Sequence, residues 1–223
     1  LAPVQELPMR MIDLQAWPWL ILFDLNGLWM LRTRDARTVE GAQAVQTEFP
    51  EGGYHGVPYR IYHRRGLREL LAWLSAKANC EWGILTSQME VTALRHVQAL
   101  LGAAFGDIVV TRIAEARWHL EGFDHCATQD IWAFDQAYCM DDPDGNRYPQ
   151  GQPVQVFDLE KVLERCEHPR GRTLVVAASD RKCASCRDRW VQCAEFDVAA
   201  VRAVEEDGLA DLQTRLVEWL GDV

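Results

Sequence analysis

The sequence contains no run of about 18 consecutive apolar residues, so no segment is predicted to cross a membrane as a helix. It also shows no secretory signal, no internal repeat and no low-complexity segment. Basic residues are the minority, because 23 Lys and Arg stand against 33 Asp and Glu, for a net charge of −10. Since an acidic surface repels phosphate backbones, nucleic acid is not expected as a primary partner.

The seven cysteines are an odd number in a chain long enough to bury its core without covalent cross-links, so reduced thiols are expected. Cys183 and Cys186 form a C-x-x-C motif, and with Cys193 they are candidate zinc ligands. A zinc site normally has a second pair of closely spaced ligands, and that spacing is absent here. A redox C-x-x-C motif normally opens a helix after a strand, which argues against a redox role. Unligated thiols are therefore the favoured interpretation, with zinc or redox chemistry as the alternative.

Short apolar runs alternate with amphipathic segments along most of the chain. Strands are predicted at residues 19–23, 80–87, 107–113 and 172–179, the first two of them buried, with further strands at 57–62 and 192–198. Helices are predicted at residues 66–78, 90–106, 158–166 and 197–220. Strands that alternate with helices imply right-handed crossovers, so the pattern predicts an α/β fold whose central parallel sheet has helices on both faces.

The chain is expected to form a single domain. Residues 1–18 are assigned to an N-terminal extension and residues 19–223 to the domain, which ends in a C-terminal helix. Two polar segments without sustained periodicity, at about 33–58 and 115–153, are predicted to be insertions. The start at Leu1 is compatible with a removed organellar presequence or with a trimmed end.

Functional groups in such sheets gather beyond the carboxyl ends of the strands, where Asp24, Thr86 and the loop after Val176 all fall. A carboxylate at a strand end can attack phosphorus and form an aspartyl-phosphate. That chemistry needs Mg²⁺ held by oxygen ligands, a second acid for the leaving group and a cation that balances charge. Asp24 could be the nucleophile, but the side chain of Asn26 cannot protonate a leaving oxygen.

Three stretches resemble, in order and spacing, the NLI-interacting-factor-like branch of the haloacid dehalogenase (HAD) superfamily. They are ILFDLNGLWML, YRIYHRRGLRELLAWLSAKANCEWGILTSQM and VFDLEKVLERCEHPRGRTLVVAASDRKC, within residues 19–197. That branch includes phosphatases of the RNA polymerase II C-terminal domain and the presequence-receptor subunit of the mitochondrial inner-membrane translocase. The resemblance implies a HAD-like, Rossmannoid fold.

The resemblance also implies a degenerate site. In the family's first motif, Asp-x-Asp, Asp24 matches but Asn26 replaces the second acid, and Thr86 matches the hydroxyl residue of the second motif. Phe157 stands where the family has its lysine. Ala177 and Ala178 stand where it has a pair of acidic or amide residues.

Loss of the acid, the lysine and the metal ligands predicts that the protein is not an enzyme and binds no cofactor. Mg²⁺ at Asp24 remains the alternative, in which a shifted alignment would recruit Lys161, Lys182 or Asp180.

The predicted function is that of a non-catalytic pseudophosphatase, which serves as a protein-binding, architectural or receptor subunit of a larger assembly. The alternative is a magnesium-dependent protein serine/threonine phosphatase with an altered site. Nine tryptophans in 223 residues favour a protein–protein surface, with Trp29, Trp118 and Trp132 as its anchors. The expected location is the mitochondrion, with the cytoplasm or the nucleus as alternatives.

Overall fold

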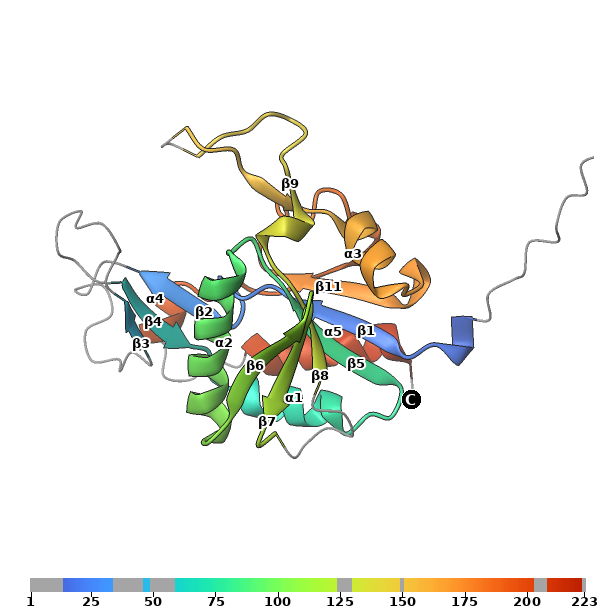
Figure 1. The fold of residues 1–223 in the computed structure, drawn as a ribbon, viewed down its shortest axis with the longest axis horizontal. Coiled ribbons are helices and arrows are strands. Elements are labelled where there is room, and N and C mark those ends of the chain that lie inside the picture. Colours follow the sequence, from blue (N-terminus) through green and yellow to red (C-terminus); the bar gives the residue numbers. More distant parts are fainter. Residues whose placement is uncertain are drawn as a thin grey trace, which may run out of the picture.

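A seven-stranded sheet forms the centre of the molecule, in the order β12-β11-β1-β5-β8-β7-β6 (Figure 1). This computed structural model describes residues 14–33, 46–48, 59–123, 130–148, 151–202 and 208–221. In spatial order, the strands are β12 Trp190–Gln192, β11 Thr173–Ala177, β1 Trp19–Phe23, β5 Cys80–Leu85, β8 Asp130–Phe134, β7 Arg117–Glu121 and β6 Val109–Ala114.

The pairing of the strands confirms the predicted α/β class. β12, β11, β1, β5 and β8 pair in parallel, whereas β7 and β6 complete the sheet as antiparallel strands. β1 lies between β11 and β5, so the strand that ends at Asp24 is central, as predicted. The predicted strand at 107–113 is β6, at the edge of the sheet.

The sequence WLILF of β1 explains its central place, because every one of its side chains is buried. Side chains alternate across a strand. Ile21 and Phe23 therefore enter the hydrophobic cluster on one face of the sheet, and Leu20 and Leu22 enter the cluster on the other. A strand buried on both faces needs such a continuous apolar run.

Helices cover both faces of the sheet (Figure 1). α1 Leu67–Ser75, α2 Glu90–Phe105 and α5 Gly208–Leu220 contribute their buried side chains to the Ile21–Phe23 face, and α3 Leu159–Cys166 packs on the Leu20–Leu22 face. Leu67, Leu70, Leu71 and Leu74 form the buried stripe of α1, at the spacing expected for a helix with one apolar face.

Two smaller sheets extend from the central one. β2 Met30–Thr33, β4 Tyr59–His63 and β3 Gln46–Glu48 form an antiparallel sheet in the order β2-β4-β3. β9 Cys139–Asp141 and β10 Gln155–Phe157 form an antiparallel pair. Four short 3-10 helices complete the described structure: η1 Leu14–Ala16, η3 Gln136–Tyr138, η4 Arg170–Arg172 and η5 Arg187–Arg189.

The boundaries differ from the sequence-based predictions at several points. The predicted strand at 192–198 is wrong, because β12 ends at Gln192 and no strand covers residues 193–197. The helix predicted at 197–220 is split into α4 Val198–Arg202 and α5.

The segment 115–153 is not an insertion throughout, because it supplies β7 and β8 to the central sheet. Most of the predicted insertion at 33–58 and residues 1–13 of the predicted extension lie outside the described residues. No helix among the residues described is long and apolar enough to cross a membrane.

Candidate functional site

The centre of the candidate site is an ion pair between Asp24 and Lys182. Asp24 follows the last residue of β1, and its backbone N–H donates to Val176 O of β11 at 3.0 Å, which holds it at the carboxyl end of the sheet. Lys182 lies in the loop that follows β11, and its Nζ donates to Asp24 Oδ2 at 2.6 Å. The side chains of Asp24 and Lys182 are 1% and 14% exposed, so the pair is largely removed from water. The other carboxylate oxygen, Asp24 Oδ1, has no hydrogen-bond partner among the described residues.

Burial and pairing act in opposite directions on the two groups. Burial raises the pKa of the Asp24 carboxyl, and the charge and hydrogen bond of Lys182 offset this only in part. Burial lowers the pKa of Lys182, but the charge and hydrogen bond of Asp24 outweigh it, so the net pKa of the ammonium is raised. Lys182 therefore stays protonated, and its positive charge compensates the negative charge of the Asp24 carboxylate.

Lys182 thus supplies the cation that Phe157 does not. The Lys182 ammonium lies 5.8 Å from the centroid of the Phe157 ring, and the Phe157 N–H donates to Lys182 O at 2.9 Å. The sequence-based expectation that the site has no compensating cation is wrong, because a lysine from a different loop reaches it. Of the three residues proposed for a shifted alignment, Lys182 is the one at the site. Lys161 donates instead to Ala137 O at 2.7 Å, and Asp180 is exposed.

Thr86 and Cys139 lie on the neighbouring side of the same sheet edge. Thr86 follows β5, is buried, and accepts at Oγ1 from the Gln88 N–H at 3.3 Å. The Cys139 thiol donates to Thr86 O at 3.8 Å. Burial raises the pKa of Cys139 to about 12, with the charge of Lys182 acting to lower it and the charge of Asp24 to raise it. Sequence reasoning missed Cys139, because only the pairing of β9 with β10 places it opposite Phe157.

The remaining motif positions provide no acid at Asp24. The Asn26 residue is exposed, in a turn that Gly27 makes possible with a φ of 82°. Ala177 is the last residue of β11 and is buried, and Ala178 follows it. A Cβ atom placed on Gly27 would lie 3.8 Å from the Ala178 side chain, so these two residues adjoin.

The donor set at Asp24 does not fit Mg²⁺. This ion needs near-octahedral oxygen coordination. One Asp24 oxygen is already held by the Lys182 ammonium, whose charge repels a cation, and Ala177 and Ala178 have no side-chain oxygen. Asp24 Oδ1 and the backbone carbonyl of Asn26 would be left as protein ligands.

The three cysteines proposed as zinc ligands do not come together. Cys183 and Cys186 lie in the hydrophobic cluster that α3 covers, whereas Cys193 lies in the cluster on the other face of the sheet. Arg64 Nη1 donates to Cys193 Sγ at 3.5 Å, which binds this thiol into a separate contact. Across the described parts of the chain, no group of three or more His, Cys, Asp or Glu side chains could hold a metal ion.

The tryptophans proposed as partner anchors are mostly part of the core. Trp29 is fully buried, with its ring centroid 5.3 Å from that of Phe23 and 5.9 Å from that of Trp82. Trp118 is a buried residue of β7. Trp132 lies on β8, partly buried, between a stacked Phe134 ring and the Arg117 guanidinium. The expectation that Trp29 and Trp118 are surface anchors is wrong, because apolar burial is their main contribution.

Large exposed apolar side chains occur elsewhere. Met89 is 64% exposed and Val91 is 62% exposed, at the start of α2. Since α2 follows β5 directly, these two residues lie at the same end of the sheet as Thr86. The Asp135 carboxylate accepts from the Glu90 N–H at 3.1 Å, which ties the start of α2 to the end of β8.

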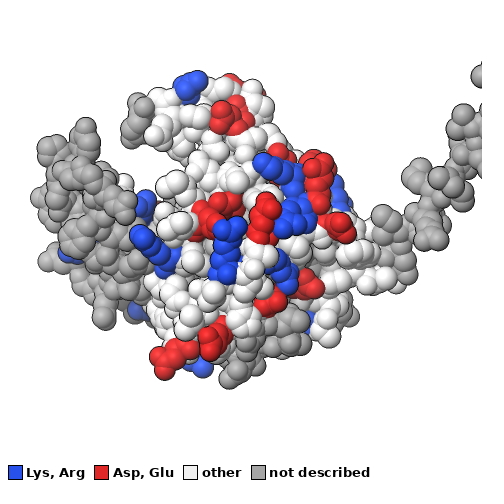
Figure 2. All heavy atoms as spheres, in the orientation of Figure 1, with Lys and Arg blue, Asp and Glu red and all other residues white. Residues whose placement is uncertain are grey.

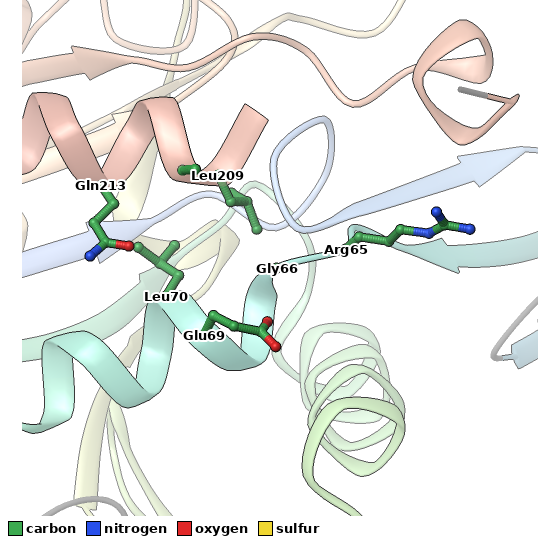
Figure 3. A pocket seen from close by; sticks show the side chains of 7 residues that line it. Arg65, Gly66, Glu69, Leu70, Leu209 and Gln213 are labelled. Atoms are coloured by element: carbon green, nitrogen blue, oxygen red, sulfur yellow. The ribbon is translucent and has the colours of Figure 1, made fainter. Parts of the chain in front are cut away.

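A cavity of about 410 Å³ lies between α1 and α5 (Figure 3), and Asp24 is not among its lining residues. Its lining is mixed, with Leu70 and Leu209 beside Glu69 and Gln213. Figure 3 shows Leu209 and Gln213 projecting from α5 towards α1, and the Arg65 side chain directed away from them. It is therefore a space between two helices and not part of the Asp24 site.

Charged side chains of both signs interleave on the face seen in Figure 2. Among the described ion pairs of the protein, Arg170 Nη2 lies 2.6 Å from Asp188 Oδ1, and Arg170 also pairs with Glu160 of α3. Exposed ion pairs of this kind contribute little to stability. Despite the net charge of −10, this face carries basic residues beside the acidic ones.

No protein-family model matches the sequence, and no curated protein matches it. Among solved structures, the chain is similar to the fission yeast RNA polymerase II CTD phosphatase Fcp1 bound to beryllium fluoride, at 12% identity and a TM-score of 0.44, over 92% of this chain and 51% of that chain. It is also similar to a structure of Fcp1 described as an essential RNA polymerase II CTD phosphatase, at 13% identity and a TM-score of 0.45, over 93% of this chain and 55% of that chain. The chain thus spans about half the length of these structures.

Proposed function

We propose that this protein is a HAD-like pseudophosphatase that works by binding another protein, as a subunit of a larger assembly. The observation that carries the proposal is the lack of side-chain oxygens at Ala177 and Ala178, at the end of β11 beside Asp24. The buried Asp24 also has a 2.6 Å contact between its Oδ2 and Lys182 Nζ. The contact gives Asp24 a structural partner, in a site whose neighbouring positions are Ala177 and Ala178 and whose donors do not fit Mg²⁺. A buried carboxylate that is paired in this way serves the fold without needing a substrate.

The start of α2 supports a partner surface at the same end of the sheet. Met89 and Val91 expose apolar side chains there. Methionine is enriched at interfaces, and Val91 adds exposed apolar area beside it. A stable interface is expected to bury at least about 1,000 Å². We further propose that the assembly is mitochondrial, which cell fractionation of the native protein would test.

The first experiment tests the interface on the full chain in native extract. Size-exclusion chromatography with mass detection should show the protein in a complex, and a Met89→Asp/Val91→Asp variant should elute at the mass of the free chain. Val217→Asp, at an exposed position on α5, is the matched control and should remain in the complex. A wild-type protein that elutes as a free monomer from native extract would contradict the proposal.

The second candidate function is a protein serine/threonine phosphatase with an altered site. Lys182 favours it, because a cation beside the carboxylate is one of the groups that phosphoryl transfer needs. The test is hydrolysis of p-nitrophenyl phosphate and of a phosphoserine peptide, with and without Mg²⁺. The pseudophosphatase proposal predicts no turnover above that of Asp24→Asn. Turnover that Asp24→Asn and Lys182→Met both abolish would establish the phosphatase instead.

A further inference from the structure

The loop that carries Lys182 also holds two cysteines, Cys183 and Cys186, at the two ends of one tight turn. Cys186 N–H donates to Cys183 O at 3.0 Å, and Cys183 N–H donates to Asp180 O at 3.2 Å, so the loop is wound into consecutive tight turns. A hydrogen bond from residue i+3 to residue i brings their Cα atoms within about 7 Å. Disulfides span Cα separations of about 4.4–6.8 Å, so the turn brings Cys183 and Cys186 to a spacing that suits one.

The two thiols share one environment. Both are fully buried in the cluster beneath α3, and neither is in a disulfide in this structure. The exposed residues Ala184 and Ser185 lie between them in sequence, so the thiols point inward from a loop whose rim is at the surface. A small opening of this loop would expose the sulfurs without disturbing the central sheet.

The contact between the thiols makes them chemically unequal. The hydrogen bond of Cys183 lowers the pKa of Cys186, burial opposes this, and Arg170 adds to the lowering. The same hydrogen bond, together with burial, raises the pKa of Cys183. In the other described cysteines with a shifted pKa, the pKa is raised, and burial is the main cause. This asymmetry favours Cys186 as the attacking thiolate, and single variants of the two cysteines distinguish them.

We propose that Cys183 and Cys186 form a reversible disulfide by exchange with small disulfides such as oxidised glutathione, and that this bond favours the loop geometry that pairs Lys182 with Asp24. In the first step, the Cys186 thiolate attacks one glutathione sulfur, forms a mixed disulfide and releases a glutathione thiolate. In the second step, Cys183 loses its proton to solvent and attacks the Cys186 sulfur, and the second glutathione thiolate leaves. Two protein thiols are oxidised and one disulfide is reduced, so two electrons pass to glutathione.

The position of the bond links it to the candidate site. Cys183 directly follows Lys182, and the Lys182 carbonyl is held by the Phe157 N–H at 2.9 Å. A cross-link at Cys183 restricts the backbone next to Lys182 and so favours the geometry that reaches Asp24. By thermodynamic reciprocity, the Asp24–Lys182 pair must then favour the disulfide by the same free energy.

The test uses the full-length protein in buffers that span a range of reduced-to-oxidised glutathione ratios. Samples are quenched in acid, treated with N-ethylmaleimide and measured by intact mass and peptide mapping. At oxidising ratios we expect the mass of the protein to fall by two hydrogen atoms. Cys183 and Cys186 should then no longer react with maleimide, and a reductant should restore both the mass and the two maleimide additions. Circular dichroism of the same samples should show a folded protein throughout.

Single variants identify the attacking thiol. Cys183→Ser should accumulate a mixed disulfide between Cys186 and glutathione, whereas Cys186→Ser should form neither product. Cys139→Ser and Cys193→Ser are the matched controls and should still form the bond. The proposal is overturned if both thiols stay free at every glutathione ratio, or if the bond forms only in samples that have lost their folded circular-dichroism signal.

The link to Lys182 has its own measurement. Lys182→Met should shift the glutathione midpoint so that a more oxidising ratio is needed, whereas Lys161→Met, on the exposed face of α3, should not shift it. An unchanged midpoint in Lys182→Met would remove the coupling between the disulfide and Asp24.

Discussion

Lys182 reaches Asp24 across 158 residues of sequence, with 2.6 Å between Nζ and Oδ2. The pair joins the end of β1 to the loop after β11, two strands that are neighbours in the sheet. Removing one partner of a buried pair leaves the other charge without compensation, which typically costs about 3–5 kcal/mol.

Lys182→Met is therefore expected to lower the free energy of unfolding by about 3 kcal/mol, since Lys182 retains some exposure to water. The double variant Asp24→Asn/Lys182→Met should recover much of the loss, because it leaves no buried charge. Urea denaturation measures both, with Lys161→Met as the control. Equal stability of Lys182→Met and wild type would contradict a stabilising ion pair.

The His168 ring predicts a specific acid sensitivity. It is buried, with Nδ1 2.9 Å from Thr173 Oγ1 and Nε2 3.1 Å from Pro18 O, and burial lowers its pKa. Because the folded pKa lies below the unfolded value of about 6.5, the folded state binds fewer protons than the unfolded chain. The stability that His168 contributes is thus present above pH 6.5 and is lost as the pH falls through the folded pKa.

His168→Gln should accordingly show a smaller loss of unfolding free energy between pH 7.5 and pH 5 than wild type, in urea titrations at both pH values. A His168→Gln protein with the full wild-type pH dependence would show that another group causes it.

Arg64 predicts a second stability effect. Its buried guanidinium donates from Nη1 to Ala194 O at 2.8 Å, and its Cζ lies 5.6 Å from the Phe196 ring centroid. These contacts join the end of β4 to the segment after β12. A lysine cannot reproduce the planar set of donors. Arg64→Lys should lose about 2 kcal/mol of unfolding free energy, as expected for a hydrogen bond to a charged donor. Arg65→Lys, at the exposed neighbouring position, should change it little, and a comparable loss there would argue against the buried contacts as the cause.

Local sequence predicted the elements that have a strong pattern of their own. β1 was predictable because WLILF is an uninterrupted apolar run, and α1 because its leucines repeat at helical spacing. β8, in contrast, was hidden inside a segment rich in polar residues, since only its pairing with β5 and β7 buries it. β7 likewise depends on tertiary pairing, with β6 and β8, and not on a distinctive pattern of its own.

The position of the candidate site could be predicted from the sequence, but the pairing of the Asp24 carboxylate with the Lys182 ammonium could not. Asp24 and Thr86 follow apolar strands, so their place at the carboxyl edge came from local sequence. Lys182 lies in a loop whose path no local pattern predicts, and its role became visible only through its contact with Asp24. Trp29 was misassigned because the Gly27 turn reverses the chain and directs the ring into the core, against Phe23.

Gly83 lies at a position in the central sheet where the packing leaves no room for a side chain. It lies in β5 opposite Trp132 of β8, and a Cβ atom placed on it would lie 2.5 Å from Trp132 O and 3.2 Å from Leu22 Cδ2. The first contact is with backbone of a paired strand, so the two strands would have to separate. Overpacking of this kind typically costs about 1–3 kcal/mol, and we expect Gly83→Ala to lie at the upper end of that range.

Gly102 gives the opposite case, because it lies in α2 with no atom within 4 Å of an added Cβ. Gly102→Ala should therefore raise the unfolding free energy by about 0.5–1 kcal/mol through helix propensity. Thermal and urea unfolding of the two variants should move in opposite directions from wild type. A Gly83→Ala protein as stable as Gly102→Ala would mean that β5 and β8 are not as closely spaced as the Gly83–Trp132 approach requires.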